Sequence, residues 1–335
     1  MATSDVSKGP SRAIVQRVLG GPEVLVLEDR SDPEPGAGQV RIAVEAAGVH
    51  LIDTRLRAGT APMGAPELPM VPGREVAGVV DVVAGDVDPT WLGRRVVAHL
   101  GMASGGYATA AIADHHALFG VPDHVTATDA VAMVGTGRTA LGVLAVADVQ
   151  ASDVVLVTGA AGGMGALLVQ AALRTGALVV GAAAGEAKVA AVEAQGVELA
   201  VDYGRDDWAE VVEKELGAKP VSLVLDGVGG AIGRTAFELC SPGAGMVLFG
   251  FASGQPLSFG VGELIGAGVA VEPGIGPRVA ALAGEVDALA ARALDALASG
   301  ALVPVVHPPF ALADAAEAHR AVEARETIGK VVLVP

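Results

Sequence analysis

From about residue 130 onward, short apolar runs alternate with stretches of helical period. The runs are DVVLVT, ALVVGAAA, ELAVDY, VSLVLDGVG and GMVLFGFA, and the stretches between them include MGALLVQAALRTG, AKVAAVEAQG and DWAEVVEKELG. Apolar runs without polar alternation are typical of strands that are buried on both faces. Their alternation with helices predicts βαβ units around a doubly wound parallel sheet.

The preceding part of the chain has a different pattern. Its β-rich segments are RAIVQRVLG, QVRIAVEAAGV, VAGVVDVVAG and RRVVAHL, and they are separated by DPEPGAGQ and GTAPMGAPELPMVPG. Strands without intervening helices, divided by Pro/Gly-rich turns, predict a small antiparallel, barrel-like unit. Near the C-terminus, GPRVAALAGEVDALAARALDALASG predicts one long amphipathic helix, and the remaining residues predict another helix and a terminal strand.

Composition excludes several classes of partner. Hydrophobic residues make up 52% of the 335 residues, which is enough for a large aliphatic core. A formal net charge of −16 disfavours nucleic acid and anionic membranes as partners. The single cysteine, Cys240, excludes an internal disulfide and any site with two thiolates. With no apolar leader or uninterrupted membrane-length run, we expect a cytoplasmic protein that binds neither nucleic acid nor membrane.

A glycine-rich turn connects the first buried strand to the helix that follows it. Gly159, Gly162 and Gly165 recur at a spacing of three residues. Backbone N–H groups and the positive end of a helix dipole meet at such a turn, and this arrangement suits a pyrophosphate. Gly159 would allow the turn, Gly162 would let the phosphates approach, and Gly165 would let the helix pack on the strand. In this context the glycines predict a dinucleotide site.

The end of the second buried strand bears on the choice between NADPH and NADH. NAD-selective sites hold the ribose 2′-hydroxyl with an acid about 20 residues beyond the glycines. Here the strand ends in Ala182, Ala183 and Ala184, and Lys188 follows as a point charge that can meet a 2′-phosphate. Glu186 favours NADH, and Lys188 has the alternative role of a solvated helix residue. We expect NADPH to be preferred over NADH.

Further motifs occur in the order that one protein family shows. They are AGVHLIDTRLRAG, PGREVAGVV, GRTAL, GAAGGMGALLVQAA, VLDGVGG, GMVLFGFASG and ETIGKVVLVP. Together they resemble the zinc-free quinone oxidoreductase (zeta-crystallin-like) branch of the medium-chain dehydrogenase/reductase superfamily, over nearly the whole chain. The resemblance implies a GroES-like β-barrel catalytic domain over residues 1–130, completed by 275–335, and a Rossmann NADP-binding domain over 131–274. It also implies a homodimer that pairs through the Rossmann domains.

The resemblance also assigns residues to the cofactor and to the substrate cleft. The residues assigned to the cofactor, which include those of the glycine turn, are Thr54, Thr139, Gly159, Ala161, Gly162, Gly163, Met164, Gly165, Gly185, Lys188, Tyr203, Val228, Phe249, Gly250, Phe251 and Lys330. Thr139 would lie near the nicotinamide. Tyr203 would flank the adenine ribose phosphate, or else be an ordinary residue at a strand end. The candidate catalytic residues are His50, Asp53 and Arg55.

The positions that hold zinc in related enzymes carry other residues here. Val49 and His50 stand where those relatives have a cysteine ligand, and Arg74 stands where they have a histidine. The loop with four cysteines is missing from the sequence, and His115 and His116 have no partners at ligand spacing. We therefore expect no metal, neither a catalytic nor a structural zinc ion.

Without a metal to polarise a carbonyl, the expected reaction is hydride transfer from NADPH to an activated acceptor, namely a quinone or an α,β-unsaturated carbonyl compound. His50 replaces the family's asparagine and is a candidate proton donor, with a local hydrogen-bonding role as the alternative. Arg55 would attract an anionic acceptor or face solvent. Two other hypotheses stay open: an enoyl reductase or tailoring enzyme for a larger polyketide-like substrate, and a non-catalytic nucleotide-binding protein.

Overall fold

A computed structural model describes residues 10–335 and divides the chain into two compact units. Unit 1 contains the described residues up to Val134, with Val306–Thr327 and Val331–Pro335. Unit 2 contains Gly135–Val305 and Ile328–Lys330. Most of the N-terminal stretch in which we expect no apolar leader lies outside the described residues.

Unit 1 is built on a mainly antiparallel sheet. Its strands are β1 (Ser11–Gln16), β2 (Leu25–Arg30), β3 (Gln39–Val49), β4 (Glu75–Val83), β5 (Arg95–His99), β6 (Ala110–Asp114), β7 (Leu118–Gly120), β14 (Phe310–Ala311) and β15 (Val331–Val334), and its helices are α1 (Leu51–Ala58), α2 (Ala127–Ala132) and α11 (Ala315–Glu323). The sheet order is β14-β15-β3-β4-β5-β7, β6 also pairs with β3, and β1 and β2 form a separate antiparallel pair. The C-terminal strands β14 and β15 thus complete a sheet that the N-terminal part begins.

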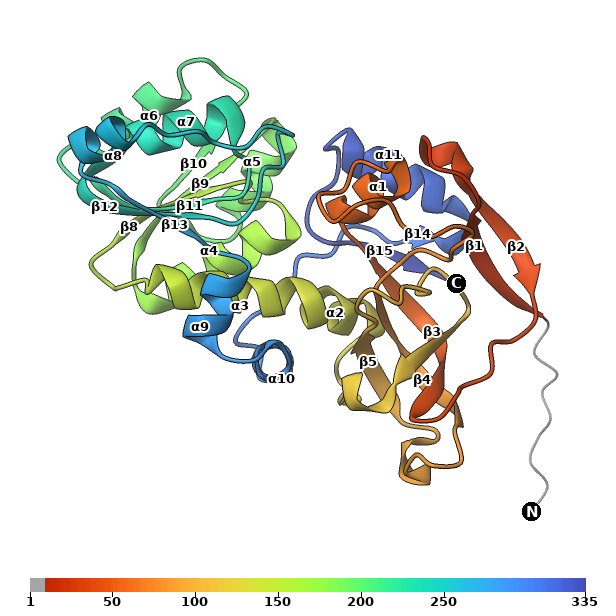
Figure 1. Cartoon of the computed structure of the whole chain (residues 1–335). Helices are drawn as coiled ribbons and strands as arrows, with labels where there is room; N and C mark the ends of the chain where they lie inside the picture. The colour runs from red at the N-terminus through yellow and green to blue at the C-terminus, as the bar shows by residue number, and fades with distance from the viewer. Residues whose placement is uncertain (1–9) are drawn as a thin grey trace. The chain divides into compact units, whose positions relative to one another are not determined.

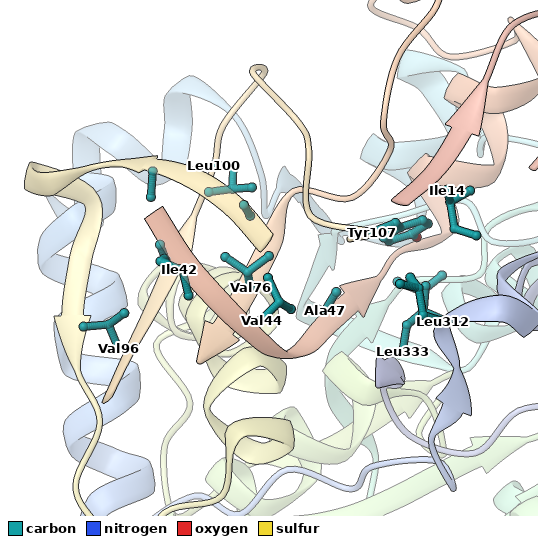
Figure 2. Packing of buried hydrophobic residues seen from close by; sticks show 14 of the residues in the cluster. Ile14, Ile42, Val44, Ala47, Val76, Val96, Leu100, Tyr107, Leu312 and Leu333 are labelled. Carbon is teal, nitrogen blue, oxygen red and sulfur yellow. The ribbon is translucent and has the colours of Figure 1, made fainter. Parts of the chain in front are cut away.

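Strand β3 organises the core of unit 1. Its first half alternates buried Val40, Ile42 and Val44 with less buried residues, as expected of a strand with one face on the core. Figure 2 shows Ile42 and Val44 in the same apolar cluster as Val76 and Val96 of the next two strands. Register shifts along the β3–β4 pair add local twist to this ladder. β3 pairs with β6 along its first residues and with β15 along its last ones.

Unit 2 is a parallel sheet with helices on both faces. Its strands are β8 (Val154–Thr158), β9 (Leu178–Ala183), β10 (Leu199–Asp202), β11 (Val221–Asp226), β12 (Cys240–Leu248) and β13 (Ala270–Pro273), and its helices are α3 (Arg138–Ala147), α4 (Gly163–Thr175), α5 (Glu186–Glu193), α6 (Trp208–Leu216), α7 (Gly230–Glu238), α8 (Val261–Ala267), α9 (Pro277–Ala283) and α10 (Val286–Ala298). The order β10-β9-β8-β11-β12-β13 is that of a doubly wound dinucleotide-binding fold. In Figure 1, α6, α7 and α8 lie on one face of this sheet and α3 and α4 on the other.

Burial explains why the strands of unit 2 are apolar without alternation. All five residues of β8 are buried, and β8 has parallel neighbours on both sides. Because consecutive connections run outward from β8 in one direction and from β11 in the other, the strand order reverses between these two neighbours. Ligands of open α/β sheets bind outside the carboxyl ends of the strands at such a reversal.

The C-terminal part of unit 2 differs from the sequence prediction in two ways. The predicted long helix is divided into α9 and α10, because Gly284 has φ +86 and Glu285 is extended. Residues 275–305, which we expected to return to the first domain, lie in unit 2, since α9 and α10 both pack against α3. The division into units falls after Val134, within a continuous helical stretch, and not at residue 130.

That helical stretch is also apolar. It runs over Ala127–Ala147 through α2, a π-helical segment (Met133–Gly137) and α3, and by length and composition alone it could cross a membrane. In the structure, 61% of its most apolar window is buried within the protein. Core helices of globular proteins pass the same composition test, so the stretch is weak evidence for a membrane span.

The packing of α4 on β8 generates a stability prediction. A Cβ on Gly165 would overlap the carbonyl oxygen of Gly159 and lie 2.9 Å from the Cα of Ala160. We expect Gly165→Ala to lower the free energy of unfolding by roughly 1–3 kcal/mol, because main-chain atoms must move apart. Denaturant unfolding checks this. Gly266→Ala in α8 is the matched control, since its Cβ meets nothing within 4 Å and is expected to leave stability equal or higher. Equal stability of the two variants would contradict the packing role.

Candidate functional site

The glycine turn lies at the carboxyl end of β8, where the chain enters α4. Gly159 has φ +64, a left-handed conformation that side chains disfavour. Gly165 lets the helix rest directly on the turn. Gly162 is the N-cap of α4, so the first N–H groups of the helix have no acceptors within the helix. This first turn also contains the predicted cofactor residues Gly163 and Met164. Together these features form a cradle for a diphosphate.

A segment from the end of the chain lies against the turn. The N–H of Gly329 donates to the carbonyl of Ala161 at 2.8 Å. Main-chain atoms of Lys330 lie 3.2 Å from the place of a Cβ on Gly163, so a side chain at this position would be a tight fit. Lys330 itself is only 5% exposed, and its N–H donates to Val305. The structure therefore brings the main chain of Lys330 to the glycine turn, and its cofactor role remains a prediction.

The loop after β12 lies along the loop after β11. The N–H of Phe249 donates to the carbonyl of Asp226 at 2.9 Å, and the N–H of Ser253 donates to that of Val228 at 2.8 Å. Val228 in turn lies 3.3 Å from the place of a Cβ on Gly159. These hydrogen bonds hold four predicted cofactor residues at the carboxyl edge of the sheet, namely Val228, Phe249, Gly250 and Phe251.

A buried carboxylate, which the sequence analysis does not single out, connects the two central strands. Asp226 ends β11, is fully buried, and accepts a hydrogen bond from the Thr158 hydroxyl at the end of β8, at 2.5 Å. It also accepts from the N–H groups of Val228 and Gly229. Burial raises the pKa of the Asp226 carboxyl, and these hydrogen bonds oppose the rise. The aspartate in VLDGVGG was the available sequence signal.

A second group of predicted residues lies where β9 and β10 end. Gly185 has φ +84, and its N–H donates to the Asp202 carboxylate at 2.9 Å. The N–H of Tyr203 donates to the carbonyl of Ala183 at 3.0 Å, and Lys188 lies in the first turn of α5. Parallel strands present their carboxyl ends at one edge, so this group and the glycine turn share that edge. Asp202, which also accepts from the N–H of Gly204 at 2.8 Å, is not among the residues predicted from the sequence.

Thr139 lines a pocket within unit 2. The pocket has a volume of about 460 Å³ and lies between the start of α3 and the segment that contains α9 and α10. Arg138 and Thr139 line it from α3, and Ile275 and Val279 are among the apolar residues opposite. The Thr139 hydroxyl donates to the carbonyl of Gly135 at 2.8 Å. Its predicted place near a nicotinamide remains a prediction.

In unit 1, His50 is held at both its main chain and its ring. It is the N-cap of α1, and its N–H donates to the Asp53 carboxylate at 2.8 Å. Its Nε2 lies 2.6 Å from the Oε2 of Glu75, a fully buried carboxylate at the start of β4. The His50 side chain is 24% exposed. The contact with Glu75 fixes the orientation of the imidazole ring.

Asp53 connects this pair to a buried polar chain. The Tyr107 hydroxyl lies 3.3 Å from Asp53 Oδ2 and 3.1 Å from His319 Nε2. Arg57 lies 3.2 Å from the other ring nitrogen of His319 and 2.6 Å from Glu323. Burial raises the pKa of Tyr107 well above its usual value. Burial also lowers the pKa of His319 to about 4; Asp53 opposes this shift and Arg57 adds to it.

Most of these buried polar residues are not among the site residues predicted from the sequence. Glu75, Arg57, Tyr107 and His319 come from four separate segments, and each is at most 5% exposed. The available signals were single polar letters inside apolar context, as in GGYATA and AHRAVE. Such letters do not reveal a partner far away in the chain.

The remaining predicted residues of unit 1 lie on α1. Thr54 is buried, and its hydroxyl donates to the carbonyl of Leu51 at 2.9 Å. Arg55 is partly exposed on the same helix. Asp53 is only 4% exposed, so its carboxylate faces the protein interior, where Arg74 Nε lies 3.4 Å away. Catalytic and cofactor roles for these residues remain predictions.

Comparison with known proteins identifies the family. Residues 36–123 match the model of the alcohol dehydrogenase GroES-like domain, and residues 195–333 match that of the zinc-binding dehydrogenase. A 2-haloacrylate reductase from Burkholderia sp. is 32% identical over 96% of this chain and 98% of its own length. A quinone oxidoreductase from Pseudomonas aeruginosa is 31% identical over 94% and 97%. A mycobacterial structure complexed with NADPH has a TM-score of 0.83 at 35% identity, over 97% of this chain and all of the other.

The chain belongs to the quinone oxidoreductase branch of the medium-chain dehydrogenase/reductase family. The predicted family and the predicted fold class, a GroES-like domain with a Rossmann-type parallel sheet, are both confirmed. Membership makes this member of the branch an oxidoreductase.

The zinc-binding name of one family model raises the question of a metal. In this quinone oxidoreductase homologue, the Arg74 guanidinium lies beside Asp53, and His50 is bonded to Glu75. The positive charge of Arg74 beside Asp53 does not suit a site for a zinc ion. Among residues 10–335, the three ligand-type groups within 4.8 Å of one another are Asp114, His115 and His116, at the surface. The expectation that these histidines have no partner at ligand spacing is therefore wrong, because the turn after β6 places Asp114 beside them.

The buried His319 makes the stability of this oxidoreductase depend on pH. Its folded pKa is about 4, whereas the ordinary value is 6.5, so the unfolded chain binds more protons between these values. We expect the free energy of unfolding to fall as the pH drops from 6.5 to 4, with His319 contributing up to about 3 kcal/mol of that loss. His319→Gln, which does not titrate, should remove this part of the loss.

Denaturant unfolding at a series of pH values measures the effect. His116→Gln is the matched control, because His116 is exposed and should leave the pH dependence as in the unaltered chain. The same pH dependence in His319→Gln as in the control would contradict the assignment.

Proposed function

We propose that this chain is an NADPH-dependent reductase that transfers hydride, without zinc, to a quinone or an α,β-unsaturated carbonyl compound. The observation that carries the proposal is the glycine turn at the carboxyl end of β8, with Gly159 left-handed and Gly165 packed on it. The NADPH in the mycobacterial relative and the names of the curated relatives support the same cofactor and reaction type.

The residues fit NADPH better than NADH. The end of β9 presents Ala182 and Ala183, both buried, in place of the acid that would hold a ribose 2′-hydroxyl. Lys188 supplies a positive charge in the next turn. The nearby carboxylate of Asp202 is bonded to the N–H of Gly185, which fixes the loop. A 2′-phosphate would thus meet a lysine and a tyrosine, Tyr203, at the two strand ends.

In the proposed reaction, bound NADPH supplies the hydride. The chain's own contribution is the orientation of the cofactor by the glycine turn and the proton held at His50. Glu75 holds the ring through Nε2, and His50, whose side chain is 24% exposed, delivers the proton to the reduced acceptor. Arg55, partly exposed on α1, would attract an anionic acceptor such as a 2-haloacrylate, the substrate in the name of one relative.

Zinc independence rests on the residues that occupy the expected ligand positions. The only cysteine, Cys240, begins β12 in unit 2. In unit 1 the two ligand-type side chains His50 and Glu75 bind each other, and Arg74 places a positive charge beside Asp53. The Arg74 guanidinium would repel a cation there, and the ligand-type atoms of His50 and Glu75 already contact each other.

We also propose a cytoplasmic homodimer that pairs through unit 2. β13 is the last strand in the sheet order, and edge strands are templates for pairing with another chain. Helix α8 exposes Val261 and Ile265 at 75% and 76%, which are high values for aliphatic side chains. Light scattering of the purified chain measures the oligomeric state directly.

The function is tested by following NADPH consumption with a panel of acceptors. We expect turnover with phenanthrenequinone or a small enone, unaffected by a zinc chelator. Turnover that rises with acceptor size would favour the enoyl reductase of a larger substrate. Cofactor binding without turnover on any acceptor would favour the non-catalytic nucleotide-binding protein, and a requirement for stoichiometric zinc would contradict the metal-free reaction.

Lys188→Ala tests the cofactor preference. Loss of a charge-assisted contact to the 2′-phosphate should weaken NADPH binding by about tenfold or more, while NADH binding stays nearly the same. Titration of nicotinamide fluorescence gives both dissociation constants. Lys214→Ala is the control, because Lys214 is 83% exposed on α6, away from the strand ends. Equal weakening of NADPH and NADH would show that Lys188 does not read the phosphate.

His50→Ala tests the proton donor. Removal of a general acid should lower kcat by about 100-fold or more, while the dissociation constant of NADPH stays near that of the unaltered chain. Steady-state kinetics with the best acceptor and fluorescence titration separate the two quantities. His116→Ala controls for the loss of an imidazole elsewhere in unit 1. An unchanged kcat in His50→Ala would remove His50 from the mechanism.

A further inference from the structure

The proposed reaction does not involve the buried polar chain of unit 1 directly. This polar chain runs from Glu323 and His319 on α11, through Arg57 and Tyr107, to Asp53 on α1. Burying this many polar side chains is unfavourable unless each has its hydrogen-bond partner. Figure 2 shows the Tyr107 ring beside Ile14, among apolar side chains that exclude water from the chain.

The chemistry of Arg57 fixes the direction of every hydrogen bond that follows. A guanidinium can only donate, so the Nδ1 of His319 must accept from Arg57 at 3.2 Å. Neutral His319 then carries its proton on Nε2 and donates it to the Tyr107 oxygen at 3.1 Å. The Tyr107 hydroxyl is therefore left to donate to Asp53, at 3.3 Å. The polar chain has one allowed polarity, from Arg57 through His319 and Tyr107 to Asp53.

The polar chain ends at one carboxylate, Asp53, which other donors also meet. Oδ2 of Asp53 accepts from the Tyr107 hydroxyl and from the N–H of His50, and Oδ1 faces Arg74. Asp53 is thus held in one orientation. The Asp53 carboxylate accepts from the N–H of His50, the N-cap residue of α1. The orientation of Asp53 therefore fixes the position of the His50 main chain, from which the His50 ring reaches Glu75.

The far end of the chain is anchored as well. The Arg57 guanidinium donates to Glu323 at 2.6 Å and to the carbonyl of Gly20 at 3.1 Å, so it cannot rotate away from His319. The His319 and Tyr107 rings meet edge to face, with centroids 5.7 Å apart. The charged or titratable groups that face His319 are therefore Arg57 and Tyr107, with Asp53 and Glu323 one contact further away.

We propose that His319 is a positioning residue for His50: by accepting from Arg57 and donating to Tyr107, it directs the Tyr107 hydroxyl onto Asp53 and so fixes the N-cap that carries the proton donor. The kinetic part of this proposal rests on the proposed function; the structural part does not. The role needs one group that accepts on one side and donates on the other, and a glutamine side chain can do both, whereas leucine can do neither.

The test compares His319→Leu, His319→Gln and Tyr107→Phe with Leu312→Ala. Leu312 is 3% exposed in the same C-terminal segment and belongs to the apolar core, so its truncation destabilises unit 1 without breaking the polar chain. Tyr107→Phe keeps the ring and removes only the hydroxyl, which provides a second break if His319→Leu does not fold. Thermal unfolding of every variant establishes that it is folded under assay conditions.

Two readouts are measured on the full-length chain. The first is hydrogen exchange at the amide of His50, followed in peptides over residues 49–56; it reports the bond to Asp53 without any turnover. The second is the division between kcat and the KM for NADPH. We expect His319→Leu and Tyr107→Phe to speed exchange and to lower kcat about tenfold at constant KM, as for a misplaced catalytic group. His319→Gln should keep both readouts near those of the unaltered chain.

Two outcomes would overturn the positioning role of His319. Exchange at His50 that is no faster in His319→Leu and Tyr107→Phe than in Leu312→Ala would show that His319 only fills the core. Faster exchange with unchanged kcat would show that the N-cap does not position a reacting group, although the reductase itself would stand. Failure of the unaltered chain to oxidise NADPH with any acceptor would instead remove the proposed function, and the exchange data would still decide the structural part.

Discussion

A buried carboxylate must be met by donors that are already in place, and this constraint shapes both units. Asp53, Glu75 and Asp226 are at most 4% exposed. Each would be strongly unfavourable without hydrogen bonds or a cation. Each therefore fixes the segments that supply its donors: the start of α1, the His50 ring, and the ends of β8 and β11. The resemblance to the family predicts site residues at several of these places.

The two units reach local order by different means. In unit 2 the determinants are mostly in the main chain: left-handed Gly159, close packing at Gly165 and N–H groups that hold Asp226. In unit 1 the determinants are side chains that reach across the sheet. Aromatic residues are only 3% of the chain, and Tyr107 is among the largest fully buried side chains. It combines a large apolar surface with one directed hydroxyl.

This contrast between the two units explains which parts of the structure the sequence predicts. The strand, turn and helix from β8 to α4 are adjacent in the chain, so the glycine spacing and the apolar period predict them. The parallel sheet was predictable for the same reason, because each βα step is local. The break between α9 and α10 escaped prediction since a single glycine, Gly284, is tolerated in many helices and breaks this one only through its left-handed conformation.

The polar chain in unit 1 could not be predicted in the same way. Arg57 and His319 are 262 positions apart, and Tyr107 and His319 are 212 apart. No periodicity connects such residues, and each one alone is compatible with a solvated surface position. Asp53 was expected to line a substrate cleft from its motif alone, whereas its burial shows a carboxylate that faces inward. The roles predicted for residues at the cofactor remain predictions.

The location of His319 and Glu323 so late in the chain has a consequence for biosynthesis. The ribosome delivers Arg57, Tyr107 and Asp53 long before α11 and β15 exist. Until then the N-terminal strands lack both a sheet neighbour for the end of β3 and the acceptors that Arg57 requires. The N-terminal part of unit 1 can therefore gain this neighbour and these acceptors only after most of unit 2 has been translated.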